Sequence, residues 1–187
     1  MNAELTTMDS GAYSRTINGK VLNLRPVRTT DAQRMLEFLN GLSYGTRYLR
    51  FGSGSAACAD EHAARLCDPS PSAWRRFTVV TDKAGSEMSL AAASYYIQDD
   101  RENCDLTILV ADEWHGSPLA GWLLTSVLDD ARRCGLRRVH AHILAINQRM
   151  IRLALRHGFV ESPETSQAPI KLLILALDEG DAEEIRQ

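Results

Sequence analysis

A turn of small residues between an apolar strand and a helix constrains the fold of this chain more than any other feature. Residues 104–110 (CDLTILV) are predicted to form a strand, and residues 117–133 a helix that Gly135 ends. The turn between them includes residues 115–120, HGSPLA. Backbone N–H groups at a helix start lack intrahelical partners and carry the positive end of the helix dipole. The segment therefore predicts a binding site for a phosphate or pyrophosphate.

Periodicity and turn residues predict the remaining elements. Strands are expected at residues 20–27, 76–81, 88–97, 138–145 and 170–177. Helices are expected from a cap at Thr30 or Asp31 to Gly41, and at residues 43–51, 60–67 and 147–157, with a loop at 52–59. The order is strand, helices, three strands, helix, strand, helix, strand. It predicts an α/β fold of mixed type around one sheet.

Length and composition favour one folded domain at residues 20–178, with a flexible N-terminal arm at 1–19 and an acidic tail at 179–187. The net charge of −3 argues against a nucleic-acid partner. No apolar run approaches the roughly 20 residues of a membrane helix, and the first residues do not resemble a secretory signal. The spacing of the four cysteines predicts reduced thiols in a cytoplasmic protein and no metal site.

Several phrases resemble the acetyl-CoA-binding core of the GNAT N-acetyltransferases. The GNAT signature Gln/Arg-x-x-Gly-x-Gly/Ala aligns with HGSPLA, and an Asn before the second core helix and a Gly-Phe after it match Asn147 and Gly158-Phe159. Residues 24–51, LRPVRTTDAQRMLEFLNGLSYGTRYLRF, resemble the GNAT domain of bacterial protein-lysine acetyltransferases. The resemblance covers about residues 20–178. It implies a mixed, mostly antiparallel sheet flanked by helices, with splayed central strands.

The resemblance also implies acetyl-CoA as the co-substrate. Backbone N–H groups at the helix start would hold the pyrophosphate, and the splayed strand end at residues 107–110 would pair with the pantetheine arm. The residues thereby assigned to cofactor binding are Leu109, Val110, His115, Gly116, Ser117, Leu119, Ala120, Gly121 and Asn147. Asn147 is also suited to cap the following helix through its side chain.

Pro118 is the main departure from the signature, because it replaces a glycine. Proline has no N–H, so one phosphate donor is lost, although proline suits the first turn of a helix. Loss of one charge-assisted hydrogen bond costs roughly 1.5–3 kcal/mol, about ten- to a hundredfold in affinity. His115 replaces the usual Gln or Arg. It is interpreted either as a phosphate donor or as an ordinary turn residue.

Asp105 is the predicted catalytic base. Most amines are protonated in water, so acyl transfer to an amine needs a group that removes a proton. The lysine-acetylating relatives carry a glutamate at this position, and the shorter aspartate would act directly or through a water. The alternative interpretation is a solvated carboxylate at a strand start. The neighbouring Cys104 would point to the opposite face of the strand.

Three further groups of residues are candidates for a functional role. His140 and His142 share one strand face but lack a third metal ligand, so they are interpreted as polar strand residues. Tyr44, Tyr48 and Phe51 follow helical spacing and are interpreted as packing residues, while Arg47, Tyr48 and the loop at residues 52–55 remain candidates for the acceptor site. The tyrosine acid of many GNAT enzymes has no counterpart near Ala154.

The sequence therefore predicts an N-acetyltransferase that moves an acetyl group from acetyl-CoA to a primary amine, on a small molecule or a protein lysine. The alternative is a non-catalytic, regulatory CoA-binding module with a degenerate pyrophosphate loop. Pro118 and the missing tyrosine favour the alternative, whereas Asp105 and the N-terminal phrase favour the enzyme. A homodimer is kept open as a further partner.

Overall fold

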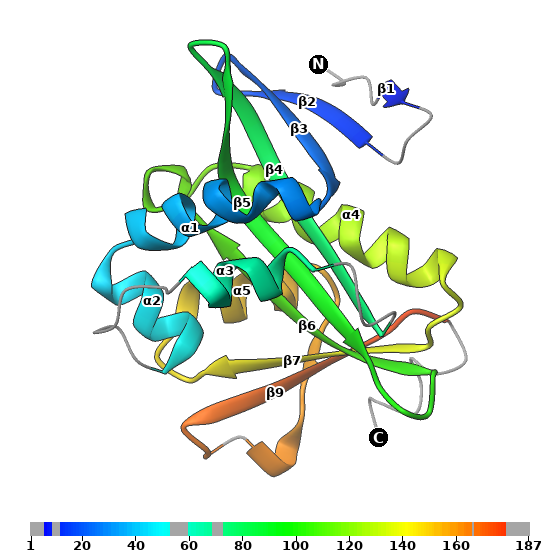
Figure 1. Ribbon diagram of the computed structural model, residues 1–187. Coiled ribbons are helices and arrows are strands. Elements are labelled where there is room, and N and C mark those ends of the chain that lie inside the picture. The colour runs from blue at the N-terminus through cyan, green and yellow to red at the C-terminus, as the bar shows by residue number, and fades with distance from the viewer. Residues whose placement is uncertain (1–5, 9–11, 53–59, 69–72, 166, 179–187) are drawn as a thin grey trace. The chain divides into compact units, whose positions relative to one another are not determined.

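The computed structural model describes residues 6–8, 12–52, 60–68, 73–165 and 167–178. The chain divides into two compact units, Met1–Ser94 with Ile108–Leu123 and Tyr95–Thr107 with Leu124–Gln187. Strands β5 (Ser86–Ile97) and β6 (Asn103–Val110) and helix α4 (Leu119–Arg133) contribute to both units (Figure 1). Each unit is described separately below.

The first unit is built on antiparallel strands. Strands β1 (Thr6–Met8), β2 (Ala12–Ile17), β3 (Lys20–Pro26) and β4 (Trp74–Lys83) are neighbours in that order, followed by β5. Its helices are η1 (Thr29–Asp31), α1 (Ala32–Gly41), α2 (Tyr44–Phe51), α3 (Asp60–Leu66) and η2 (Asp112–Trp114), and α1 packs against α3. Buried side chains of the strands and of α1 form its apolar core, including Leu22, Leu24, Val79, Leu90, Met35 and Phe38.

The expectation of a flexible N-terminal arm at residues 1–19 is wrong for residues 12–17. Residues 12–17 form β2 and pair with β3 from Tyr13↔Leu24 to Ile17↔Lys20. The turn residues Asn18 and Gly19 both have positive φ, at 51° and 74°. That backbone suits the primed turn of a two-residue hairpin, for which Asn-Gly is a strong sequence signal. The Asn18-Gly19 dipeptide is thus the sequence signal for this hairpin, within a segment expected to be a flexible arm.

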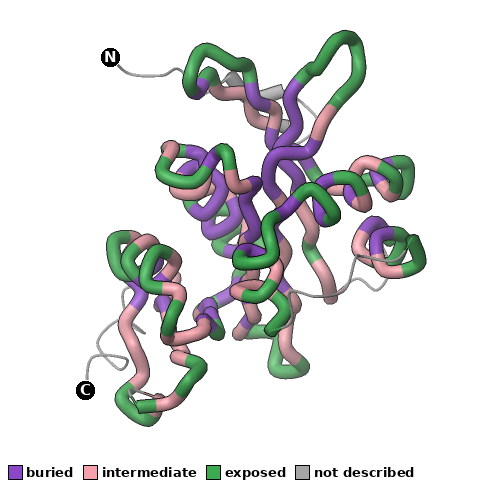
Figure 2. Tube along the Cα trace, turned by 90° about the vertical axis from the view of Figure 1, so that its left-hand side faces the viewer, coloured by how far each residue is buried: buried purple, intermediate pink, exposed green. Residues whose placement is uncertain are grey.

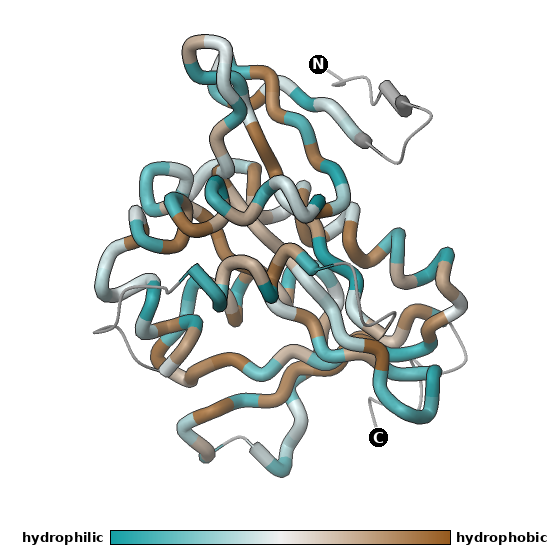
Figure 3. The backbone as a smooth tube through the Cα atoms, viewed as in Figure 1, coloured by the Kyte–Doolittle hydropathy of each residue, from teal (hydrophilic) through white to brown (hydrophobic). Residues whose placement is uncertain are grey.

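The second unit has strand order β6-β7-β9-β8, with β7 at Arg138–Leu144, β9 at Ile170–Ala176 and β8 at Val160–Glu161. Helix α5 (Gln148–Arg156) and η3 (Pro163–Thr165) lie between these strands in sequence. Hydrophobic residues dominate β9, whereas polar and apolar residues alternate along β7 (Figure 3). The buried residues of β7, β9 and α4, among them Val139, Ala141, Leu173, Val127 and Leu128, form the apolar core of this unit (Figure 2).

The pairing of β6 with β7 is parallel and short. It covers Asn103–Asp105 against Arg138–His140, whereas β7 stays paired with β9 in antiparallel register through Leu144. The ladder between β6 and β7 thus ends well before β7 does, as expected for splayed central strands. The mixed α/β fold class is confirmed, and the predicted elements occur in the predicted order, with β1, β2 and β8 in addition. Within the described residues, no helix is both long and apolar enough to cross a membrane.

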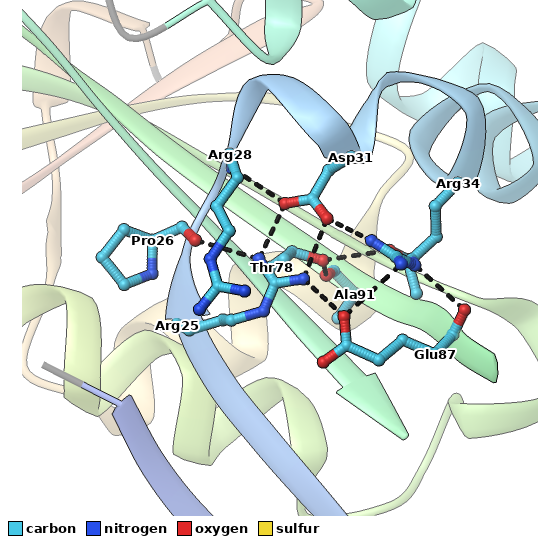
Figure 4. Close-up of polar contacts among 9 residues, drawn as sticks. Arg25, Pro26, Arg28, Asp31, Arg34, Thr78, Glu87 and Ala91 are labelled. Carbon is cyan, nitrogen blue, oxygen red and sulfur yellow. Dashed lines mark hydrogen bonds and ion pairs between the residues drawn. The ribbon is translucent and has the colours of Figure 1, made fainter. Parts of the chain in front are cut away.

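A buried ionic cluster joins β3, α1 and β5 in the first unit (Figure 4). Asp31 is fully buried and accepts two hydrogen bonds from the guanidinium of Arg25, at 2.7 and 2.8 Å. It also accepts the backbone N–H of Arg28 and pairs with Arg34, and Arg25 reaches Glu87 at 2.8 Å. The bidentate geometry compensates the buried charges. The phrase RPVRTTD therefore serves folding.

Candidate active site

The predicted pyrophosphate turn is in the first unit and is shaped by η2 and Gly116. After β6 the chain forms η2, extends at His115 (φ −62°, ψ 136°), and turns at Gly116 with φ +83°. An L side chain rarely adopts that φ, which explains the glycine. A Cβ at Gly116 would meet nothing within 4 Å, so the turn stands in open space. An anionic ligand can therefore approach its backbone.

The N–H groups of this turn fall into two sets. Ser117 donates its N–H to the Trp114 carbonyl at 3.2 Å, and Leu119 donates to the Ser117 hydroxyl at 3.3 Å. Among the described residues, the N–H groups of Gly116, Ala120 and Gly121 have no such partner. Pro118 contributes no N–H. The turn and the start of α4 therefore offer three N–H donors, from Gly116, Ala120 and Gly121, whereas those of Ser117 and Leu119 are already hydrogen-bonded.

The side chain of His115 is hydrogen-bonded to the backbone at the end of β6. Its Nε2 lies 3.0 Å from the Val110 carbonyl, to which it donates, and its Nδ1 lies 4.0 Å from Oδ1 of Asp112. Val110 and Leu109 are themselves buried at the end of β6. The imidazole thus already has a protein partner, which supports the interpretation as a turn residue. Its assignment to the cofactor stays a prediction.

Asp112 ties the pyrophosphate turn to the start of α2. Its Oδ1 accepts the hydroxyls of Ser43 and Thr46, both at 2.6 Å, and its Oδ2 accepts the Ser43 N–H at 2.8 Å. Burial raises the pKa of this carboxyl, but the hydrogen bonds from Ser43 and Thr46 outweigh it and lower the pKa to about 2. The sequence analysis noted both segments as family-like phrases but did not foresee that they meet.

Ser43 serves this contact and α2 at once. It is the N-cap of α2, and its hydroxyl accepts the N–H of Thr46 at 3.2 Å while donating to Asp112. A hydroxyl donates one hydrogen and accepts others, so one serine satisfies the helix end and the carboxylate together. The sequence signal for this arrangement is Ser43, a typical cap residue, three positions before Thr46, which carries a second hydroxyl.

The predicted base, Asp105, lies in the second unit within a polar cluster. Its Oδ2 accepts the side-chain amide of Gln98 at 3.0 Å, and its Oδ1 lies 3.5 Å from Nδ1 of His142. The same Gln98 nitrogen lies 3.3 Å from Nδ1 of His140. Asp105 is thus not a lone solvated carboxylate. The sequence analysis missed Gln98 and kept the two histidines apart from Asp105, although the parallel register pairs Asp105 with His140.

The remaining predicted residues are placed as follows. The Asn147 side chain caps α5 by accepting the N–H of Met150 at 3.2 Å, which confirms the cap; its contact with a cofactor stays a prediction. Cys104 is buried, and burial raises the pKa of its thiol to about 12, which argues against a nucleophile. Ala154 is buried. No group of three metal-ligating side chains occurs in the described parts of the chain.

The aromatic residues of α2 differ from the expected packing role. Tyr44, Tyr48 and Phe51 are 62%, 38% and 42% exposed, and the rings of Tyr44 and Tyr48 stack with centroids 6.4 Å apart. Helical spacing alone cannot tell a core stripe from an exposed one. Arg47, the other acceptor-site candidate here, donates to the Leu42 carbonyl at 2.7 Å. The candidate loop at 52–55 lies outside the described residues except for Gly52.

Comparison with known proteins identifies the family. The family model of the acetyltransferase (GNAT) domain matches residues 22–160, well over half of the chain. The chain belongs to the GNAT acetyltransferase family. The predicted GNAT fold and the predicted acyl-CoA-dependent N-acetyltransferase are thereby confirmed at the level of the family.

Similar proteins agree with this family. Acetyltransferase PA5475 of Pseudomonas aeruginosa is 27% identical over 160 residues, which are 84% of this chain and 86% of that protein. The crystal structure of the GNAT domain of S. lividans PAT has a TM-score of 0.79 at 19% identity, over 91% of this chain and 99% of that chain. Spermidine N-acetyltransferase from Vibrio cholerae, in complex with CoA and spermine, has a TM-score of 0.68 at 18% identity, over 83% and 95%.

Proposed function

We propose that this acetyltransferase uses acetyl-CoA to acetylate a primary amine, with a protein lysine as the leading acceptor, and that Asp105 belongs to its proton-accepting site. The observation that carries the proposal is the hydrogen bonding of the Asp105 carboxylate. Its Oδ1 is shielded from solvent and has no hydrogen-bond donor among the described residues. A carboxylate with unused acceptor capacity is suited to base chemistry.

The residues of the first unit fit acetyl-CoA as a co-substrate. A pyrophosphate needs several N–H donors at a helix start, and Gly116, Ala120 and Gly121 supply three from an open turn. Acetyl-CoA supplies the acetyl group as a thioester. Within this unit, Leu109, Val110, His115, Ser117 and Leu119 complete the proposed cofactor set, as the resemblance implies.

The protein residues then have two tasks. The N–H groups at the start of α4 bind and orient the anionic cofactor, which lowers the entropy of bringing two reactants together. The cluster around Asp105 removes the proton that the amine must lose. No tyrosine stands near Ala154 to protonate the departing thiolate, so solvent supplies that proton.

The choice of lysine as the leading acceptor rests on two observations. The phrase at residues 24–51 resembles the lysine-acetylating relatives. The exposed aromatic side chains of α2 offer a surface on which a peptide can pack. Small amines such as spermidine, the substrate named for the Vibrio cholerae enzyme, are the competing acceptor class.

Two measurements test this function. Calorimetry with acetyl-CoA should show one site, and a free-thiol assay should show CoA release with lysine peptides above the rate of hydrolysis. Faster turnover with polyamines than with every lysine peptide would replace the acceptor class. Binding of acetyl-CoA without turnover on any amine would support the non-catalytic CoA-binding module, which Pro118 favours.

A further inference from the structure

We propose that His142 receives the amine proton, and that Asp105 acts through His142 by holding its imidazole in the productive tautomer. The proposal rests on the proposed amine acetylation. It assigns a catalytic role to a histidine that the sequence analysis interpreted as an ordinary strand residue. The three groups involved, Asp105, Gln98 and His142, all lie in the second unit.

The two oxygens of Asp105 point to an indirect role for the carboxylate. Oδ2 already accepts the Gln98 amide at 3.0 Å. Oδ1 is shielded from solvent, and Nδ1 of His142 is 3.5 Å away. An amine on a second molecule cannot reach a shielded oxygen as readily as an exposed ring. The His142 side chain is 58% exposed, against 37% for Asp105.

The position of Asp105 selects a tautomer of His142. A carboxylate accepts hydrogen bonds and donates none when ionised, so the ring nitrogen facing it is best occupied by N–H. With the hydrogen on Nδ1, the lone pair is on Nε2, at the far side of the ring. A carboxylate beside a histidine also stabilises the imidazolium that forms when Nε2 takes up a proton. A modest closure of the 3.5 Å separation makes the hydrogen bond, as catalytic contacts often tighten in the complex.

His140 is a poorer proton acceptor than His142, because the Gln98 amide already donates to its Nδ1 and because its pKa is lowered. Burial lowers its pKa, and although Asp105 and Asp100 raise it, His142 and Arg138 lower it further. The Gln98 nitrogen carries two hydrogens, one for Oδ2 of Asp105 and one for Nδ1 of His140. Gln98 thereby holds the Asp105 carboxylate and the His140 ring together. His142 remains the exposed imidazole of the cluster.

The proton transfer balances as follows. The nitrogen of the neutral amine forms a bond to the thioester carbonyl carbon, and its surplus proton moves to Nε2 of His142. The carbon–sulfur bond breaks, and its electron pair leaves with the CoA thiolate, which takes a proton from solvent. His142 then returns its proton to solvent. The products are the amide and CoA with a free thiol.

The test replaces one histidine at a time in the full chain. His142→Gln should lower kcat by roughly 10²–10³-fold with little change in the Kd for acetyl-CoA, since a positioned base contributes about 10²–10⁴. The low-pH fall of kcat/KM should become shallower but not vanish, because the acceptor amine still takes up a proton at low pH whereas Gln does not. His157→Gln is the matched control, since its Nδ1 lies 2.9 Å from the Leu153 carbonyl on α5, and it should keep activity. Added imidazole should partly restore a His142→Ala variant.

A spectroscopic readout separates this proposal from the function on which it rests. Nitrogen NMR at high pH should show the Nδ1–H tautomer for His142, and Asp105→Asn should shift it toward the Nε2–H form. Full turnover in His142→Gln, or an Nε2–H tautomer in the parent, would overturn the role of His142 while amine acetylation stands. An inactive parent that shows the Nδ1–H tautomer would overturn amine acetylation and the proton transfer with it, leaving a structural Asp–His contact.

Discussion

Asp31 and Asp105 are both carboxylates in polar clusters, but their partners differ. Asp31 is fully buried, and Arg25, Arg34 and the Arg28 N–H fill both of its oxygens. Asp105 is partly exposed, with one oxygen bound to an amide and the other without a donor in the described structure. Burial raises the pKa of Asp31, but Arg25 and its other partners outweigh this, so its pKa is lowered. A carboxylate held ionised in this way stabilises the fold, whereas unused acceptor capacity leaves room for chemistry.

Among the variants that test this comparison, Asp105→Asn is expected to have the largest effect, on turnover. Asp105→Asn keeps the size of the side chain but removes the negative charge that holds and stabilises the His142 imidazole. We expect kcat to fall by roughly 10²–10⁴-fold with little change in the Kd for acetyl-CoA or in the unfolding midpoint. Steady-state kinetics and calorimetry measure these quantities. Asp99→Asn, in the neighbouring exposed turn, is the control. An equal loss of kcat in the two variants would contradict a specific catalytic role for Asp105.

Asp31→Asn should act on stability instead. The change removes the buried carboxylate that Arg25 and Arg34 share and leaves Arg25 with only the partly exposed Glu87, and breaking a buried pair costs about 3–5 kcal/mol. Urea unfolding at neutral pH measures the free energy. Asp129→Asn is the matched control, because Asp129 pairs with Arg132 at an exposed site where an ion pair contributes about 0–1 kcal/mol. A loss at Asp31 no larger than the loss at Asp129 would refute the structural role of the cluster.

Pro118→Gly tests the donor count at the start of α4. The new N–H should tighten acetyl-CoA binding by up to about tenfold, since one charge-assisted hydrogen bond is offset by added loop entropy. Calorimetry gives the Kd. Pro163→Gly, at the start of η3, removes a proline elsewhere and should leave the Kd unchanged. Unchanged or weaker binding in Pro118→Gly would show that the N–H at this position does not face the pyrophosphate.

The smallest effect concerns Asp112 and pH. Its folded pKa of about 2 lies below the usual unfolded value of about 3.9, so Asp112 stabilises the fold above that value. This stability is lost as the pH falls from about 4 to 2. Asp112→Asn should cost up to about 1 kcal/mol at pH 7, reduced by the solvent exposure of the site. Urea midpoints across pH 2–7 should show a smaller acid-induced loss in the variant, and parallel curves would contradict the assignment.

Local sequence signals were enough to predict most elements. Gly41 and Gly135 end helices as expected, and Asn147 caps α5. The residues that local patterns could not place are those whose partners are distant in sequence. Asp112 contacts Ser43 and Thr46 across more than sixty residues, and such pairings depend on tertiary packing. The Asn18–Gly19 turn is a different case, because its signal was present in the sequence and was overlooked.

The residues of the candidate site fall into the same two groups: those that local sequence signals identify and those that depend on distant partners. Asp105 and the pyrophosphate turn were found from residue types at family-like positions. Gln98 and His142 were not, because a glutamine and an exposed strand histidine carry no signal until their side-chain contacts with Asp105 are known. Helical spacing also failed to tell the exposed aromatic residues of α2 from a core stripe, since periodicity gives a shared face and not its neighbour.

The Ser43–Asp112 contact has a consequence for how this enzyme can change its specificity. Mutations that select a new acceptor are expected in α2, whose first turn is fixed by Ser43 and Thr46. The same hydroxyls hold Asp112, three residues before His115 and four before Gly116. Under the proposed function, this contact would couple acceptor preference to cofactor affinity. A lineage that remodels α2 must either keep Ser43 and Thr46 or acquire a compensating change in the cofactor turn.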